Sequence, residues 1–195
     1  MKRLFDILFS LLLLILLIPV FIVLSIVVKA TSRGPVLFKQ RRIGKDKAEF
    51  YIFKFRTMYL ETPKNMPTHL LENPDRYITP VGKLLRKTSL DELPQLINII
   101  KGEMSFVGPR PALYNQYDLI SLRDEHGVNC YRPGVTGWAQ INGRDELEIS
   151  EKVDFDSYYV KNRSLWFDIK IIFITFFKAF FGYGVVEGKK TLEKV

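Results

Sequence analysis

The sequence predicts an α+β protein, mostly helical, with a membrane helix at the start and an interfacial helix near the end. An uncharged apolar run opens the chain, one pair of alternating segments suits a small β-hairpin, and several later segments have apolar residues at helical spacing. We therefore expect a membrane-embedded helix at residues 1–30, a globular domain with a helical core at 31–186 and a tail at 187–195.

The apolar run at residues 7–28 is long enough to cross a bilayer, but it also suits another topology. As a straight helix it would be about 33 Å long, against a bilayer core of about 30 Å. Pro19 should break or kink this helix, because it lacks an N–H and clashes with the preceding turn. Basic residues flank the run on both sides and resist translocation. A re-entrant helix, with Met1 and Lys29 on the same side, is favoured over a kinked span, which stays open.

The hairpin is predicted at residues 36–58, with its turn at 44–47. Alternation places two cations, Lys54 and Arg56, on one face and aromatic residues on the other. Either the basic face is solvated above an aromatic core, or one of the two cations contacts a phosphate. The aromatic face would consist of Tyr51, Phe53 and Phe55.

Recurring prolines at residues 61–80 predict a loop, either a binding loop or a connector. A short basic helix should follow at 81–87. Ser89 should cap the next helix, with Glu92 as its capping-box partner, and Gly102 should end it. This helix would have an apolar face made of Leu93, Leu96, Ile97 and Ile100.

A glycine-punctuated segment at residues 132–144 has an arginine at each end and no acid between them, so its backbone amides could approach a phosphate. A helix is expected at 153–160. The aromatic-rich segment at 165–181 has one broad apolar face, which predicts a helix in the membrane interface. A second span is the alternative, which its charges disfavour. The opposite side carries Asp168, Lys170, Thr175 and Lys178, interrupted by Ile171 and Ile174.

The net charge of +8 favours an anionic partner, either nucleic acid or phosphate groups at a membrane surface. The apolar ends favour the membrane, and the sequence has no zinc-ligand spacing or other nucleic-acid motif. Cys130 is the single cysteine, so no intrachain disulfide can form. This is consistent with a reducing compartment.

Asp91 and Glu92 form an adjacent carboxylate pair and are the strongest candidates for chemistry. Acids in the first turn of a helix often do no more than complement its dipole. Here Arg86 precedes them, and Arg110 follows between two prolines that stiffen its backbone. Arginine binds phosphate oxygens with two donors at once, and carboxylates with Mg²⁺ complete a diphosphate site. Aspartate can also attack phosphorus as a nucleophile.

Three motifs resemble the signature blocks of the bacterial monotopic phosphoglycosyl transferases, also called bacterial sugar transferases. They are LDELPQ at residues 90–95, VGPRP at 107–111 and RPGVTG at 132–137. The resemblance runs from about residue 2 to residue 186 and implies the minimal single-domain form. The family's re-entrant helix often breaks at a Ser-Pro pair, whereas this chain has Ile18-Pro19.

The resemblance implies transfer of a sugar 1-phosphate from a UDP-sugar to a polyprenyl (undecaprenyl) phosphate, with release of UMP. The product would initiate a capsule, O-antigen or exopolysaccharide at the cytoplasmic face of the bacterial inner membrane. The resemblance also implies Mg²⁺ held by Asp91 and Glu92, with Asp91 as the nucleophile of a covalent phosphosugar–aspartate and Glu92 as its partner. The implied phosphate-binding residues are Lys54, Arg86, Arg110, Arg132 and Arg144.

Two rival functions stay open beside this one. In the first, transfer takes one step and Asp91 is the general base for the lipid phosphate. In the second, the chain is a non-enzymatic scaffold that binds lipid head groups through its basic surface. Residues 110–117 are similar to capsule-type members that use N-acetylated 6-deoxyhexosamine donors, such as N-acetylfucosamine. The oligomeric state is not predicted.

Overall fold

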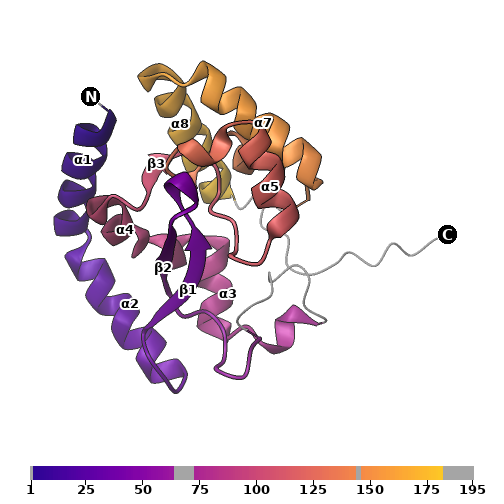
Figure 1. Ribbon diagram of the computed structural model, residues 1–195. Helices are drawn as coiled ribbons and strands as arrows, with labels where there is room; N and C mark the ends of the chain where they lie inside the picture. Colours follow the sequence, from indigo (N-terminus) through magenta and orange to yellow (C-terminus); the bar gives the residue numbers. More distant parts are fainter. Residues whose placement is uncertain (1, 64–72, 144–145, 182–195) are drawn as a thin grey trace.

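The computed structural model describes residues 2–63, 73–143 and 146–181, and it confirms the mostly helical α+β class (Figure 1). Elements labelled η are 3₁₀ turns. In chain order the elements are α1 (Lys2–Leu16), α2 (Ile18–Thr31), β1 (Leu37–Ile43), η1 (Lys45–Lys47), β2 (Glu49–Phe55), η3 (Pro74–Arg76), α3 (Pro80–Lys87), η4 (Leu90–Glu92), α4 (Gln95–Lys101), β3 (Ser105–Val107), α5 (Tyr117–Glu125), η5 (Val128–Cys130), β4 (Gly134–Thr136), α6 (Trp138–Ile141), α7 (Ile149–Asn162) and α8 (Leu165–Phe181).

The apolar run forms two helices, α1 and α2, which meet near Leu17 with a bend of 64°. Pro19 lies in the first turn of α2, where its missing N–H leaves no helical hydrogen bond unmade, so the break falls just before it. Within the described residues, no single helix is long and apolar enough to cross a membrane, whereas the bent pair passes that test together. The predicted break is therefore confirmed, and Figure 1 shows the pair along one side of the molecule.

Three helices, α1, α2 and α8, expose apolar side chains, and two of them, α1 and α8, bury polar ones. On α1, Asp6 and Ser10 are buried while Leu8 is 58% exposed. On α8, Trp166 is 81% exposed while Asp168 is 5% exposed. This is the reverse of a helix on a water-soluble domain. Extended apolar surface of this kind marks a face that meets lipid or a partner.

The side of α8 that looks polar in the sequence is the side that packs on the protein. Ile171, which interrupts that side, is completely buried (0% exposed), and Ile174 packs around the same core cluster. The two isoleucines are therefore the core contacts of the helix. The predicted apolar face is left exposed, as Phe173 (62%) and Phe176 (65%) show.

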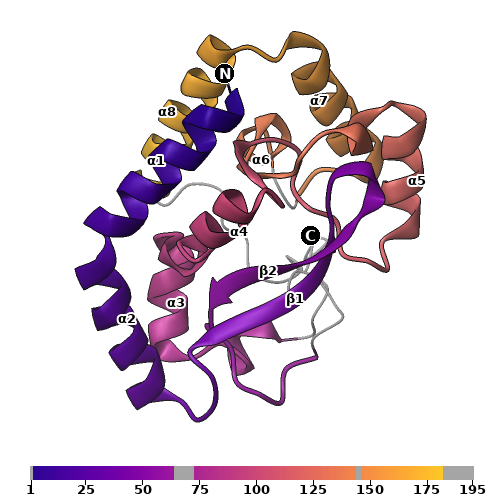
Figure 2. The same ribbon diagram turned by 60° about the vertical axis from the view of Figure 1, so that its left-hand side comes forward.

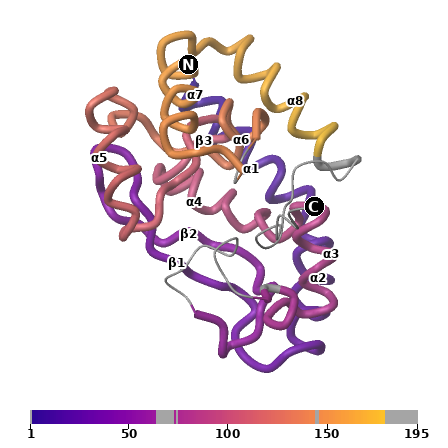
Figure 3. Tube along the Cα trace, turned by 90° about the vertical axis from the view of Figure 1, so that its right-hand side faces the viewer, coloured from indigo at the N-terminus to yellow at the C-terminus, as the bar shows by residue number. Residues whose placement is uncertain are grey.

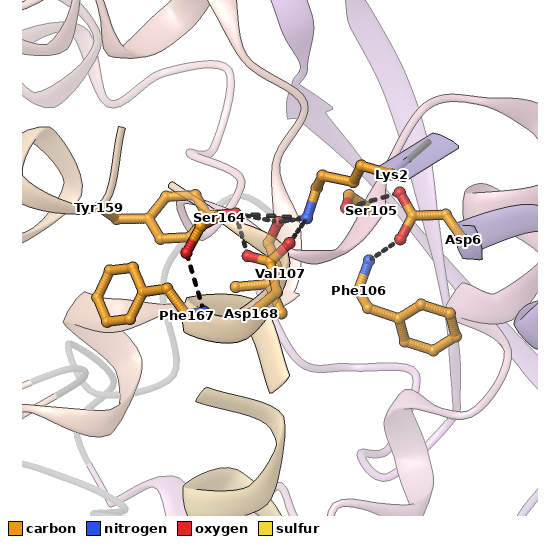
Figure 4. Close-up of polar contacts among 9 residues, drawn as sticks. All are labelled: Lys2, Asp6, Ser105, Phe106, Val107, Tyr159, Ser164, Phe167 and Asp168. Atoms are coloured by element: carbon orange, nitrogen blue, oxygen red, sulfur yellow. Dashed lines mark hydrogen bonds and ion pairs between the residues drawn. The ribbon is translucent and has the colours of Figure 1, made fainter. Parts of the chain in front are cut away.

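Two buried carboxylates tie the start of α1 to β3 and α8 (Figure 4). Asp6 accepts a hydrogen bond from the Ser105 hydroxyl at 2.8 Å. Lys2 forms an ion pair with Asp168, whose other oxygen accepts a hydrogen bond from the Tyr159 hydroxyl at 2.7 Å. Burial and the Asp168 carboxylate raise the pKa of Tyr159, so its phenol stays protonated and donates. The amino end of α1 is thus held against the domain.

The other end of the bent pair is held by Arg56. Its guanidinium donates to the backbone carbonyl of Ser32 at 2.7 Å, to the Ser32 hydroxyl at 2.8 Å and to the carbonyl of Pro35 at 2.5 Å. Arg56 is 4% exposed. The phosphate contact that the sequence allowed for Arg56 is therefore wrong, because these donors bind the backbone that leaves α2.

The predicted hairpin is confirmed, with β1 and β2 antiparallel and Leu37 paired to Phe55. Its predicted core face is wrong in the middle of β2. Tyr51 is 56% exposed, whereas Phe50 and Ile52 on the opposite face are buried against Leu96 of α4. Since β2 has apolar residues on both faces, alternation alone could not decide which face the helices cover.

The predicted helices at 81–87 and 153–160 are confirmed within α3 and α7. Part of the predicted loop at 61–80 lies outside the described residues, and its last residue, Pro80, begins α3 after the N-cap Thr79. The trace in Figure 3 shows α3 close to α2.

Candidate functional site

The acid pair lies in η4, a single 3₁₀ turn between α3 and α4. The predicted capping box is wrong, because Ser89 has a left-handed φ of 57° and makes no capping hydrogen bond, and α4 begins only at Gln95. Glu92 cannot serve as its partner, since the Glu92 carboxylate is engaged by Lys54. Gly102 ends α4 with a φ of 90°, as predicted.

Three charged side chains far apart in the sequence meet at this turn. The Lys54 ammonium, from β2, donates to Oε1 of Glu92 at 2.7 Å. The Arg110 guanidinium lies 3.7 Å from the same oxygen. The side chains of Lys54 and Glu92 are only 17% and 10% exposed. The structure thus brings two of the predicted phosphate-binding residues, Lys54 and Arg110, to the acid pair, and their contact with a phosphate stays a prediction.

Burial and the neighbouring carboxylates have opposite effects on the pKa of Lys54. Burial lowers the pKa of Lys54, and the Arg110 charge lowers it further. The carboxylates of Glu92 and Asp91 act in the other direction and favour the ammonium form. Asp91, which is 7% exposed, is therefore close enough for its charge to act on Lys54.

A cavity of about 660 Å³ opens beside the cluster, a volume suited to a nucleotide-sized ligand. Among the described residues, Glu92 and Arg110 belong to its wall, whereas Asp91 is buried next to Glu92 and does not. Other wall residues come from α1, α3, α4, β3, β4, α6 and α8, and the residue from α3 is the cation Lys87. The apolar side of the cavity consists of Leu13, Leu93, Leu96, Phe106, Val135 and Ile141.

The backbone that presents Arg110 is fixed by the close pairing of β3 with β4. These short strands are parallel, and the Gly134 amide donates to the carbonyl of Pro109 at 2.9 Å. A Cβ on Gly134 would lie 2.1 Å from the nitrogen of Gly108. This glycine therefore permits close backbone approach, and its amide is not free for the phosphate contact that the sequence suggested.

Among the described residues, Arg110 is the one predicted phosphate-binding residue in the cavity wall, and Lys54 lies behind the wall in contact with Glu92. Arg132 donates from Nε to the carbonyl of Gly102 at 2.8 Å and is not in the wall. Arg86 lies in the last turn of α3, which packs on η4, and is not in the wall either. Arg144 falls outside the described residues.

Sequence reasoning missed the contribution of α8 to the cavity. Thr175 and Lys178 line it, and Lys178 donates a hydrogen bond to the backbone carbonyl of Ile141. Their spacing of three residues on the polar side of a helix was the available signal. Helical spacing alone does not show which element that side would face.

A metal site at the acid pair would need a substrate to complete it. No group of three or more His, Cys, Asp or Glu side chains suited to a metal is present in the described part of the chain. Mg²⁺ commonly binds through one or two carboxylates, with waters and substrate phosphates as further ligands. Asp91 and Glu92 fit that pattern.

The fold and the cavity define a protein whose charged site lies between helices with exposed apolar faces. Comparison of the sequence with known proteins then identifies its family. Residues 1–182 match the bacterial sugar transferase family, and the chain belongs to it. This confirms the family that the three motifs indicated.

Curated relatives cover most of this chain. It is 45% identical over 187 residues to the UDP-glucose:undecaprenyl-phosphate glucose-1-phosphate transferase of Escherichia coli K12, which covers 92% of this chain and 40% of that protein. It is 40% identical over 188 residues to the exopolysaccharide production protein ExoY of Sinorhizobium fredii, and the match covers 89% of this chain and 83% of that protein. It is 40% identical over 189 residues to the uncharacterized sugar transferase EpsL of Bacillus subtilis, and the match covers 96% of this chain and 91% of that protein. The chain therefore spans about two fifths of the length of the Escherichia coli relative.

Proposed function

We propose that this protein transfers a sugar 1-phosphate from a UDP-sugar to undecaprenyl phosphate, releasing UMP and initiating a surface polysaccharide such as a capsule or exopolysaccharide. The observation that carries the proposal is the cluster of Glu92, Lys54 and Arg110 at a nucleotide-sized cavity beside helices with exposed apolar faces. The names of several relatives in the same family describe such a transfer.

Asp91 is buried behind Glu92, so in the proposed course its side chain turns into the cavity when the substrate binds, and one of its carboxylate oxygens attacks the phosphorus next to the sugar. A bond from Asp91 to phosphorus forms, the bond from that phosphorus to the UMP phosphate oxygen breaks, and UMP leaves. The phosphate oxygen of the lipid then attacks the phosphosugar–aspartate and frees Asp91. Lys54 and Arg110 offset the negative charge of the diphosphate, and Arg110 can do so with two parallel donors.

Mg²⁺ bound by Asp91 and Glu92 would supply further positive charge to the diphosphate. Glu92 also favours the ammonium form of the buried Lys54, since its carboxylate opposes the effect of burial on the Lys54 pKa. The proposed partner role of Glu92 is therefore electrostatic.

UMP release from a panel of UDP-sugars tests the function. With undecaprenyl phosphate and Mg²⁺, we expect UMP and a lipid-linked sugar diphosphate in equal amounts from one preferred donor, and no reaction in EDTA. UDP-glucose is the donor named for a relative, whereas the motif at residues 110–117 favours an N-acetylated 6-deoxyhexosamine. Failure of every UDP-sugar to release UMP would refute the proposal.

We propose further that the bent pair is re-entrant and that the domain lies on the cytoplasmic face of the inner membrane. Both ends of the pair are tied to the same domain, through Lys2 at the start and Arg56 at the end. A span would carry one end about 30 Å away, across the bilayer core. The basic flanks also favour the cytoplasmic side for both ends.

Cysteine labelling tests this topology. In a Cys130→Ser background, a cysteine placed before Met1 and the separate variant Lys29→Cys should both resist an impermeant maleimide in intact spheroplasts. Both should react after permeabilisation, as the exposed native Cys130 should in the parent protein. Labelling of either end from outside would contradict the re-entrant form.

A further inference from the structure

We infer that Lys178 of α8 binds the phosphate of the lipid acceptor where the acceptor enters the cavity. This inference rests on the proposed function and adds a residue to the acceptor side of the site. The inference concerns the helices α1 and α8, whose first turns are joined by the ion pair of Lys2 and Asp168 (Figure 2).

The cavity is lined from both of these helices. Leu13 of α1 and Thr175 and Lys178 of α8 belong to the same wall as Glu92 and Arg110. A ligand between the two helices can therefore reach the acid–cation cluster without passing through the folded domain.

The outer surfaces beside these wall residues are apolar. On α1, Leu12 and Leu16, which flank Leu13, are 51% and 63% exposed. On α8, Phe177, which precedes Lys178, is 44% exposed. An isoprenoid chain lying against these side chains stays in an apolar environment while its phosphate turns into the cavity.

Among the described residues that α1 and α8 contribute to the cavity wall, Lys178 is the cation. Its ammonium donates to the carbonyl of Ile141, a neutral group, and one such bond leaves two of its three N–H donors. Within the described residues it forms no ion pair. Its aliphatic stem can follow the apolar wall while the ammonium points to a phosphate.

The acceptor, rather than the nucleotide donor, is the ligand that this position suits. A phosphate that moves from the bilayer surface into a partly apolar cavity loses hydration, and a cation at the entrance offsets that cost. UDP-sugars are water-soluble and do not need to enter between the apolar-faced helices. Lys178 should therefore affect the acceptor and leave the donor unaffected.

The variant Lys178→Gln separates charge from structure, because the glutamine amide can still donate to the Ile141 carbonyl. In neutral detergent, we expect its KM for undecaprenyl phosphate to rise about tenfold, as for loss of one hydrogen bond to a charged group. The KM for the UDP-sugar, measured at saturating acceptor, should not change. Lys178→Arg should restore most of the acceptor affinity.

Lys170→Gln is the matched control. Lys170 lies on the same helix, but its ammonium is over the ring of Trp138 at 5.9 Å from the centroid and it is not part of the cavity wall. It should match the wild type in both KM values. A fluorescent farnesyl phosphate supplies a readout without turnover, and its Kd should rise about tenfold in Lys178→Gln alone.

Three results would overturn the inference. The first is an unchanged KM and Kd for the acceptor in Lys178→Gln. The second is an equal rise in the KM values for donor and acceptor. The third is a rise in the acceptor KM that occurs in vesicles with phosphatidylglycerol but not in neutral detergent. The last would assign Lys178 to bulk phospholipid head groups. A wild-type protein that releases no UMP would instead refute the proposed function, whatever the farnesyl phosphate binding shows.

Discussion

Asp91→Asn is expected to reduce UMP release by at least about 10⁴-fold, the scale of losing a catalytic nucleophile in other enzymes. Asparagine has nearly the same shape as aspartate, so the η4 turn, where Asp91 is 7% exposed, should be kept. The amide has no negative charge and is a poor nucleophile toward phosphorus. Initial rates of UMP release and the melting temperature of the purified variant measure the two effects separately.

The exposed acid Asp154 on α7 gives the matched control, since Asp154→Asn removes the same charge away from the cavity wall and should leave the rate unchanged. A membrane scaffold without enzymatic activity would tolerate Asp91→Asn, so full function in that variant would exclude our mechanism.

A one-step transfer with Asp91 as a base predicts the same loss and needs another measurement. Without lipid acceptor, the wild type should retain labelled sugar phosphate on the protein, and Asp91→Asn should not. Rapid quenching that detects no such adduct in the wild type would favour the one-step course. Release of one equivalent of UMP under the same conditions should accompany the adduct.

Local signals predicted the parts of the fold that depend on neighbours in the chain. Pro19 marked the break because a proline acts on its own helix within one turn. Gly102 marked the end of α4 because its left-handed backbone suits glycine. The outward face of α8 could be read from helical spacing, since aromatic residues recur on it.

Parts of the site that depend on contacts between distant segments could not be predicted in the same way. The burial of Lys54 depends on η4 and α4 covering one face of the hairpin, which the alternation in β2 does not reveal. The place of Lys178 in the cavity depends on where α8 docks. The motif around Glu92 indicated a site, but it also satisfied the rule for a helix cap, and the ion pair with Lys54 decided between them.

Gly134→Ala is expected to lower the free energy of unfolding by about 3 kcal/mol, combining overpacking with loss of a hydrogen bond. The added Cβ would lie 2.1 Å from the nitrogen of Gly108 and 2.3 Å from the carbonyl oxygen of Thr136. Both are backbone atoms at the β3–β4 pair, so no side-chain rotation can relieve the contact. The strands must separate, and the Gly134–Pro109 hydrogen bond lengthens or breaks.

The same separation should displace Arg110, which follows Pro109 directly, so UMP release should fall even in the folded fraction. In a chain of this size, 3 kcal/mol corresponds to a melting temperature about 10 °C lower. Gly127→Asn is the matched control, because a Cβ there would meet nothing within 4 Å and asparagine tolerates its φ of +67°. A melting temperature for Gly134→Ala within about 2 °C of this control would contradict the prediction, because the β3–β4 pair would then separate at little cost in free energy. The need for glycine at position 134 would in that case come from a contact with substrate.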